Sequence, residues 1–201
     1  MTRRILTSAY LLLVLAGVAL AQSSLGALSA KLSSGTAEFE YSFTTSGSQT
    51  PFTGSGKAFV SGARYRIEGN GLDIRCDGSV RYTADAAAGE MVIEAAEGET
   101  LDFLSNPALL LSDIAGNFNV EKAVKQADGR EVCELSPVNE PSVSLLKLVL
   151  VKGLPSEAEL FMNDGSKVEF KVSGFSFVSD GGPWSFSPSE LAKYSTVTDL
   201  R

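Results

Sequence analysis

Alternation of apolar and polar residues over many short segments is the feature that most constrains how this chain can fold. Phe39, Tyr41 and Phe43 are separated by polar residues, and this period of two is typical of a half-buried antiparallel strand. Similar strand candidates follow at residues 56–61, 64–68, 72–76, 80–83, 91–94, 118–124, 130–135, 144–152, 157–162 and 167–177. Glycine-containing turn signals separate many of them, so the sequence predicts a meander of hairpins.

Three short helices are predicted beside these strands. Residues 22–34 carry leucines at helical spacing. An Asn-Pro pair at the start of segment 106–114 predicts a helix of two or three turns that stops before Gly116. A capping-box pattern at residues 187–190 opens a last small helix. We therefore expect one mainly-β domain with about ten or eleven strands and three helices.

The first 21 residues have the pattern of a secretory signal peptide. Arg3 and Arg4 precede an apolar run at residues 5–18, and Ala-Leu-Ala at 19–21 fits a cleavage site. The mature chain is then expected to begin near Gln22, outside the cytoplasm and without a lipid tether or stable membrane anchor. An uncleaved signal anchor is the alternative.

Composition excludes several classes of function. The leader holds two of the 17 Lys and Arg and none of the 24 Asp and Glu, so the mature formal charge is 15 minus 24, or −9. That charge disfavours nucleic acid and anionic membrane surfaces. The chain has no histidine, which removes the commonest general base and the usual catalytic zinc ligand. With no nucleotide-binding, metalloprotease or calcium-loop motif either, we expect no enzyme, no cofactor and no metal site.

Cys76 and Cys133 are the two cysteines of the chain. An even number in an oxidising compartment predicts one disulfide between them. Two buried thiols on separate strands are the alternative.

Several short motifs follow one another in a recognisable order. After the leader and first helix come the alternating aromatics and then the motifs Lys-Ala-Phe-Val-Ser-Gly-Ala-Arg-Tyr-Arg-Ile at 57–67, Cys-Asp-Gly-Ser-Val-Arg-Tyr at 76–82, Glu-Met-Val-Ile at 90–93, Asn-Pro-Ala-Leu-Leu-Leu at 106–111, Gly-Asn-Phe-Asn at 116–119 and Thr-Asp-Leu-Arg at 198–201. This order resembles the periplasmic outer-membrane lipoprotein carrier (LolA) family. The Asn-Pro segment and the terminal motif are most similar to its Bacteroidetes-type members.

The resemblance implies a single strongly curved, incompletely closed antiparallel β-barrel with an α-helical lid. It also implies a function: a monomeric periplasmic carrier or chaperone that binds the acyl chains of lipoproteins in an apolar cavity. Its partners would be an inner-membrane lipoprotein-releasing complex and an outer-membrane acceptor. A periplasmic lipid-binding sensor or interaction module on the same fold is the alternative.

The alternating apolar residues supply candidates for the cavity. We expect its wall to consist of Phe39, Tyr41, Phe43, Tyr65, Ile67, Leu72, Ile74, Tyr82, Met91 and Ile93, with a lid made of Leu109, Leu110, Leu111 and Ile114. Ordinary core packing is the alternative for each, because apolar residues with a period of two look the same in a filled core and in a lined cavity.

Overall fold

The computed structural model of the chain describes residues 24–47, 51–96, 110–111 and 114–201. The predicted signal peptide, the lid residue Leu109 and most of the helix predicted over 106–114 lie outside these residues. The three described helices are α2 (Ser24–Ser34), α3 (Ile114–Asn117) and α4 (Pro188–Leu191). Among them none is long and apolar enough to cross a membrane.

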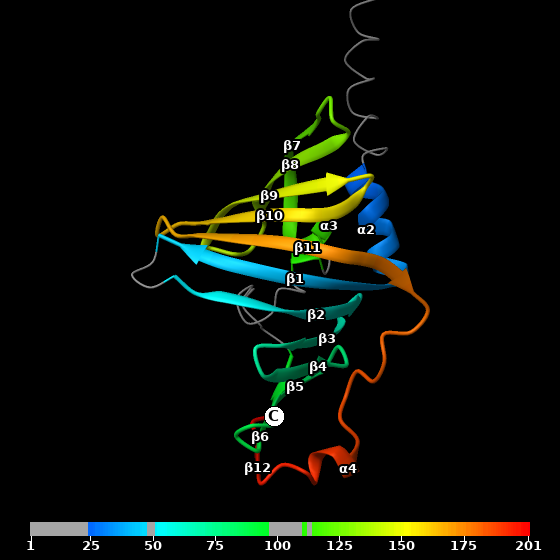
Figure 1. Ribbon diagram of the computed structural model, residues 1–201, viewed down its shortest axis with the longest axis vertical. Helices are drawn as coiled ribbons and strands as arrows, with labels where there is room; N and C mark the ends of the chain where they lie inside the picture. The colour runs from blue at the N-terminus through cyan, green and yellow to red at the C-terminus, as the bar shows by residue number, and fades with distance from the viewer. Residues whose placement is uncertain (1–23, 48–50, 97–109, 112–113) are drawn as a thin grey trace, which may run out of the picture.

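The strands follow one another much as the alternation predicts (Figure 1). Those before the lid segment are β1 (Thr36–Ser46), β2 (Thr53–Ser61), β3 (Arg64–Gly69), β4 (Leu72–Cys76), β5 (Val80–Asp85) and β6 (Glu90–Ala95). Those after it are β7 (Phe118–Lys125), β8 (Arg130–Pro137), β9 (Val143–Val151), β10 (Leu154–Met162), β11 (Lys167–Val178) and β12 (Thr196–Asp199).

All described strands belong to one sheet with the order β12-β6-β5-β4-β3-β2-β1-β11-β10-β9-β8-β7. Every neighbouring pair is antiparallel except β12 and β6, which run parallel. The sheet has β12 and β7 as its two edges and is not closed. This confirms the predicted mainly-β, incompletely closed sheet.

Two details of the predicted elements are wrong. The sheet has a twelfth strand, β12, which the alternation did not reveal because all four of its side chains are exposed. It joins the sheet through its backbone beside Glu90–Ile93 of β6. The described helical turn α3 includes Gly116, before which the predicted helix was expected to stop, and it leads directly into β7.

One face of the sheet, here called the inner face, carries most of the core. Leu25, Leu28 and Leu32 of α2 pack into the same cluster of buried side chains as β1, β3, β9, β10 and β11. These leucines are spaced at three and four residues, so they form one stripe of the helix. Helix α2 therefore covers part of the inner face, and it lies within the helix predicted over 22–34.

The opposite, outer face carries a smaller apolar cluster near β5 and β6. Buried Ala84, Met91, Ile93 and Phe186 form it, with Tyr82 packed against them. Phe186 belongs to the segment after β11, which runs along the sheet to α4 and β12 in Figure 1. The end of the chain is therefore held on the outer face.

Candidate functional site

Three aromatic residues of β1 lie at the centre of the inner face. Phe39, Tyr41 and Phe43 are each less than 7% exposed, and the ring centroids of Tyr41 and Phe43 lie 6.4 Å apart. Burial raises the pKa of the Tyr41 hydroxyl above its ordinary value, so this group stays neutral. The predicted wall residues of β1 therefore share one apolar, uncharged surface.

Two glycines make room for these rings. In the register of β1 and β2, Gly54 lies opposite Phe43 and Gly56 lies opposite Tyr41. A Cβ atom on Gly56 would come within 2.7 Å of the Tyr41 hydroxyl oxygen, and one on Gly54 would come within 2.4 Å of the Phe43 ring. The aromatic side chains therefore lie directly over the backbone of β2.

A row of directly paired residues extends the apolar surface to the other half of the sheet. Phe43 pairs with Phe170, Phe170 with Ala158, Ala158 with Leu148, and Leu148 with Cys133. Paired residues point to the same face, and all five are buried. The inner face is thus apolar across β1, β11, β10, β9 and β8, a region that the sequence-based choice of wall residues missed. The alternation of apolar and polar residues within 144–152 and 167–177 was the sequence signal that could have identified this region.

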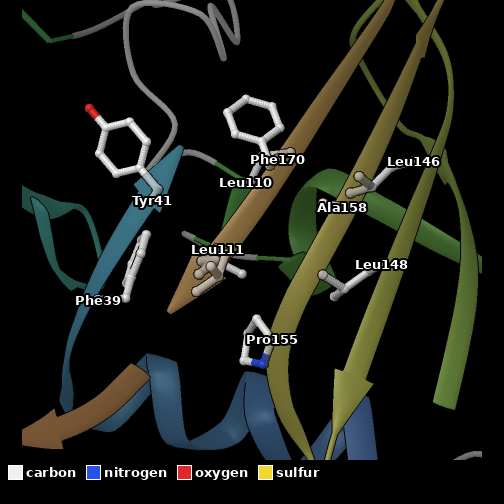
Figure 2. Close-up of a pocket in the computed structure, with 10 residues that line it drawn as sticks. Phe39, Tyr41, Leu110, Leu111, Leu146, Leu148, Pro155, Ala158 and Phe170 are labelled. Atoms are coloured by element: carbon white, nitrogen blue, oxygen red, sulfur yellow. The ribbon is translucent and has the colours of Figure 1, made fainter. Parts of the chain in front are cut away.

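The described lid residues pack against this surface. Leu110, Leu111 and Ile114 are 6%, 3% and 2% exposed and belong to the inner cluster. Figure 2 shows Leu110 and Leu111 between β1 on one side and β10 and β11 on the other. The three residues therefore lie over the inner face, and their role as a lid stays a prediction.

A small cavity remains beneath Leu110 and Leu111. Its volume is about 20 Å³, and its lining is formed by Phe39, Tyr41, Leu110, Leu111, Leu146, Leu148, Pro155, Ala158, Phe170 and Val172 (Figure 2). This is space for about one water molecule, whereas pockets for small ligands measure roughly 300–1,000 Å³. Leu110 and Leu111 therefore occupy most of the apolar space between β1 and the strands β9, β10 and β11.

Three of the predicted wall residues lie on the wrong face. Pairing through β3 and β4 puts Tyr65, Ile67 and Ile74 on the inner face, where they are buried, with Leu72 partly buried beside them. Tyr82 instead pairs with Arg75 and with Ile93, and these side chains share the outer face with Met91. The prediction that Tyr82, Met91 and Ile93 line the cavity is therefore wrong. The cavity lining also lacks the predicted wall residues Phe43, Tyr65, Ile67, Leu72 and Ile74, although they lie on the inner face. Alternation identifies two faces of a strand but not which one a neighbouring strand shares.

The predicted disulfide is absent from the structure. Cys76 and Cys133 are both buried thiols. The cross-strand neighbours of Cys76 are Tyr65 and Arg81, and six strands separate β4 from β8 in the sheet order. Burial, followed by the charge of Glu131, raises the pKa of the Cys133 thiol to about 11. That thiol therefore stays protonated at neutral pH and packs as a small apolar group.

Comparison with known proteins gives likenesses only to solved structures. No family model matches the sequence, and no curated protein matches it. The LolA superfamily protein NE2245 from Nitrosomonas europaea is 10% identical over 83% of this chain and 97% of its own, with a TM-score of 0.46. A putative outer membrane lipoprotein-sorting protein domain from Vibrio parahaemolyticus is 12% identical over 84% of this chain and 95% of its own, with a TM-score of 0.43.

A third similar structure is that of the Pseudomonas aeruginosa MucA/MucB complex. The matched chain is 12% identical over 83% of this chain and 60% of its own, with a TM-score of 0.31. None of these likenesses points to a Bacteroidetes-type member. A shared fold does not by itself assign a ligand or a partner. The function of this chain is therefore argued from its own inner face.

Proposed function

We propose that this chain is a periplasmic carrier that binds the acyl chains of lipoproteins on the inner face and takes them from the inner to the outer membrane. One observation carries the proposal: two adjacent leucines, Leu110 and Leu111, fill a space whose other described lining residues are almost all apolar. They act as a plug that an acyl chain replaces.

The energies allow this exchange. Exposing two buried leucine side chains costs on the order of 3–6 kcal/mol. An acyl chain gains about 0.8 kcal/mol for each buried methylene, so roughly a dozen methylenes gain on the order of 10 kcal/mol. A ligand shifts a conformational equilibrium by the difference in its affinity for the two states. Here the free energy gained by burying the acyl chain exceeds the cost of exposing the two leucines, so the ligand favours the open state.

The compartment follows from the predicted signal peptide, and the cargo from the physics of transfer. A lipid-anchored protein that crosses an aqueous space exposes its acyl chains unless another protein covers them. The inner face offers a continuous apolar surface over five strands for this purpose. Transfer between membranes then requires only that the plug opens for loading and again for release.

The test is binding of a fluorescent long-chain acyl probe to the purified chain beginning at Gln22. We expect saturable binding by the wild type and tighter binding by the double variant Leu110→Ala/Leu111→Ala, because smaller side chains lower the cost of opening. Leu135→Ala is the control: Leu135 is also buried in the inner cluster but does not line the cavity.

The control distinguishes a plug from an ordinary core. All of these substitutions are expected to lower stability, since each leaves a cavity in a packed interior. A gain in affinity confined to the plug variant supports the proposal. Absence of probe binding by the wild type, or an equal gain in the control, would refute it. Lipoproteins retained by the immobilised wild type from a periplasmic extract, and released by an excess of the acyl probe, identify the cargo.

A further inference from the structure

A second and larger cavity lies at one end of the inner face, between α2 and the strands β7, β8 and β9. Its volume is about 350 Å³, which is within the range of small-ligand pockets. Its polar lining comes from Lys31 of α2, Lys125 of β7, Glu131 of β8 and Lys152 after β9. The cavity beneath the lid is apolar, so the two cavities differ in chemistry.

Glu131 is a buried carboxylate with an unused oxygen. The residue is 4% exposed, and its Oε2 atom has no hydrogen-bond partner in the described part of the chain. Its other oxygen, Oε1, lies 4.0 Å from the Sγ atom of Cys133. A buried carboxylate without a partner is costly and calls for an explanation. A donor group on a ligand in this cavity supplies one.

Three lysines line the same cavity as this carboxylate. Lys125 is the direct cross-strand neighbour of Glu131. The Nζ atom of Lys31 lies 5.7 Å from the centre of the Phe177 ring. The backbone of Lys152 has a φ of 53°. Among the ion pairs of the described residues, none includes any of the three. With Glu131 ionised, the four side chains carry a formal charge of +2 in a chain whose formal net charge is −7. The cavity therefore suits an anion that also carries a hydrogen-bond donor.

The polar cavity adjoins the apolar one along β9. Leu148 lines the cavity beneath the lid, and Leu150 lines the cavity with the lysines. Side chains two residues apart on a strand point to the same face, about 7 Å from each other. An amphiphile with its acyl chain beneath the lid would therefore place its head group beside Glu131.

We infer that this cavity binds the phosphoethanolamine head group of a lipid, with the ammonium donating to Glu131 and the phosphate lying among Lys31, Lys125 and Lys152. This inference rests on the proposed acyl site. It adds a phospholipid as a second class of ligand for that site, with a preference between lipids that share the same acyl chain, because the ammonium meets a carboxylate and the phosphate meets the lysines.

The test compares two lysophospholipids with one identical acyl chain, lysophosphatidylethanolamine and lysophosphatidylglycerol, below their micelle concentrations. Both carry a phosphate, but only the first carries an ammonium. A hydrogen bond between charged groups predicts that the wild type binds the ethanolamine lipid about tenfold more tightly. Glu131→Gln is expected to remove this preference. Glu134→Gln, on the same strand but the other face, should retain it.

A second variant tests the phosphate contacts without altering a buried residue. Lys125→Gln/Lys152→Asn should weaken binding of both lysophospholipids relative to a monoacylglycerol of the same chain. Asn is chosen because it tolerates the positive φ at 152. Lys122→Gln/Lys171→Gln, which removes two lysines that do not line the cavity, is the control.

The outcomes separate the two proposals. Equal affinity of the wild type for both lysophospholipids overturns the head-group inference and leaves the acyl carrier standing. A preference that survives Glu131→Gln also overturns it. Binding of none of the three lipids contradicts the proposed function as well. Binding of glycerophosphoethanolamine as tightly as the lysolipid would show that a soluble phosphoethanolamine compound, and not a lipid, is the ligand.

Discussion

Arg75 is the residue whose replacement should most clearly reveal how the end of the chain is attached. It is 5% exposed on the outer face of β4. Its Nε and Nη2 atoms donate to the Asp73 carboxylate at 3.1 and 2.7 Å, and its Nη1 atom donates at 3.1 Å both to the Ser185 carbonyl and to Glu190. Its guanidinium carbon also lies 3.8 Å from the centre of the Phe186 ring.

The cost of Arg75→Met can be estimated from these contacts. Removing one partner of a buried ion pair typically costs about 3–5 kcal/mol. Asp73 and Glu190 have side chains that are 27% and 32% exposed, so water can solvate them again after the change. That discount leaves a loss of about 2–3 kcal/mol. For a chain of this length the melting temperature should fall by about 4–12 °C.

Thermal unfolding and limited proteolysis of the segment between β11 and α4 measure this effect. Arg81→Met is the matched control, since Arg81 forms an ion pair with Glu94 in which both side chains are partly exposed, and its loss should cost about 1 kcal/mol or less. Arg75→Met should also expose the segment to protease. The reasoning is refuted if both variants have the same melting temperature. It is also refuted if the segment stays protected from protease while the melting temperature of Arg75→Met falls.

Three further predictions concern pH, packing and reactivity. The Ser187 hydroxyl and backbone N–H, followed by Arg75, lower the pKa of Glu190 to about 2. The contribution of Glu190 to stability is therefore complete above about pH 4.5 and declines as the pH falls towards 2. In acid unfolding, the stability of Glu190→Gln should depend less on pH over that window than the stability of the wild type. Gly56→Ala should destabilise the chain by about 1–3 kcal/mol in urea, because the new Cβ would come within 2.4 Å of the Glu68 carbonyl oxygen and 2.7 Å of the Tyr41 hydroxyl oxygen. An unchanged midpoint would contradict the close packing described. Cys133 should resist alkylation at pH 8 in the folded protein and react after denaturation, because its pKa is about 11; labelling at equal rates in both states would contradict its burial.

Much of the fold could be predicted from local pattern. Strand β4 has the predicted bounds, and β3, β6 and β7 differ from theirs by one residue at one or both ends. The capping box also begins α4 as expected, with Ser187 accepting from the Glu190 backbone N–H and Glu190 reaching back to the Ser187 backbone. These features depend on residues close together in the chain, so the sequence carries them without knowledge of the tertiary structure.

The candidate site was only partly predictable. Phe39, Tyr41, Leu110 and Leu111 line the cavity, whereas Phe43 belongs to the same buried cluster without lining it. The lining from β9, β10 and β11 was missed because it comes from strands that meet β1 only through the long-range pairing of β1 with β11. No local pattern states which distant strand completes a sheet.

The sequence by itself determined the secondary structure and the presence of an apolar face, because both follow from side-chain periodicity and turn residues. Tertiary structure alone decided which face each strand contributes, that the two cysteines lie apart, and that Leu110 and Leu111 line the cavity. Register and long-range pairing control those outcomes, and a shift of one residue in register moves every side chain of a strand to the other face. The same long-range assembly brings Glu131 and three lysines from separate elements to a single cavity.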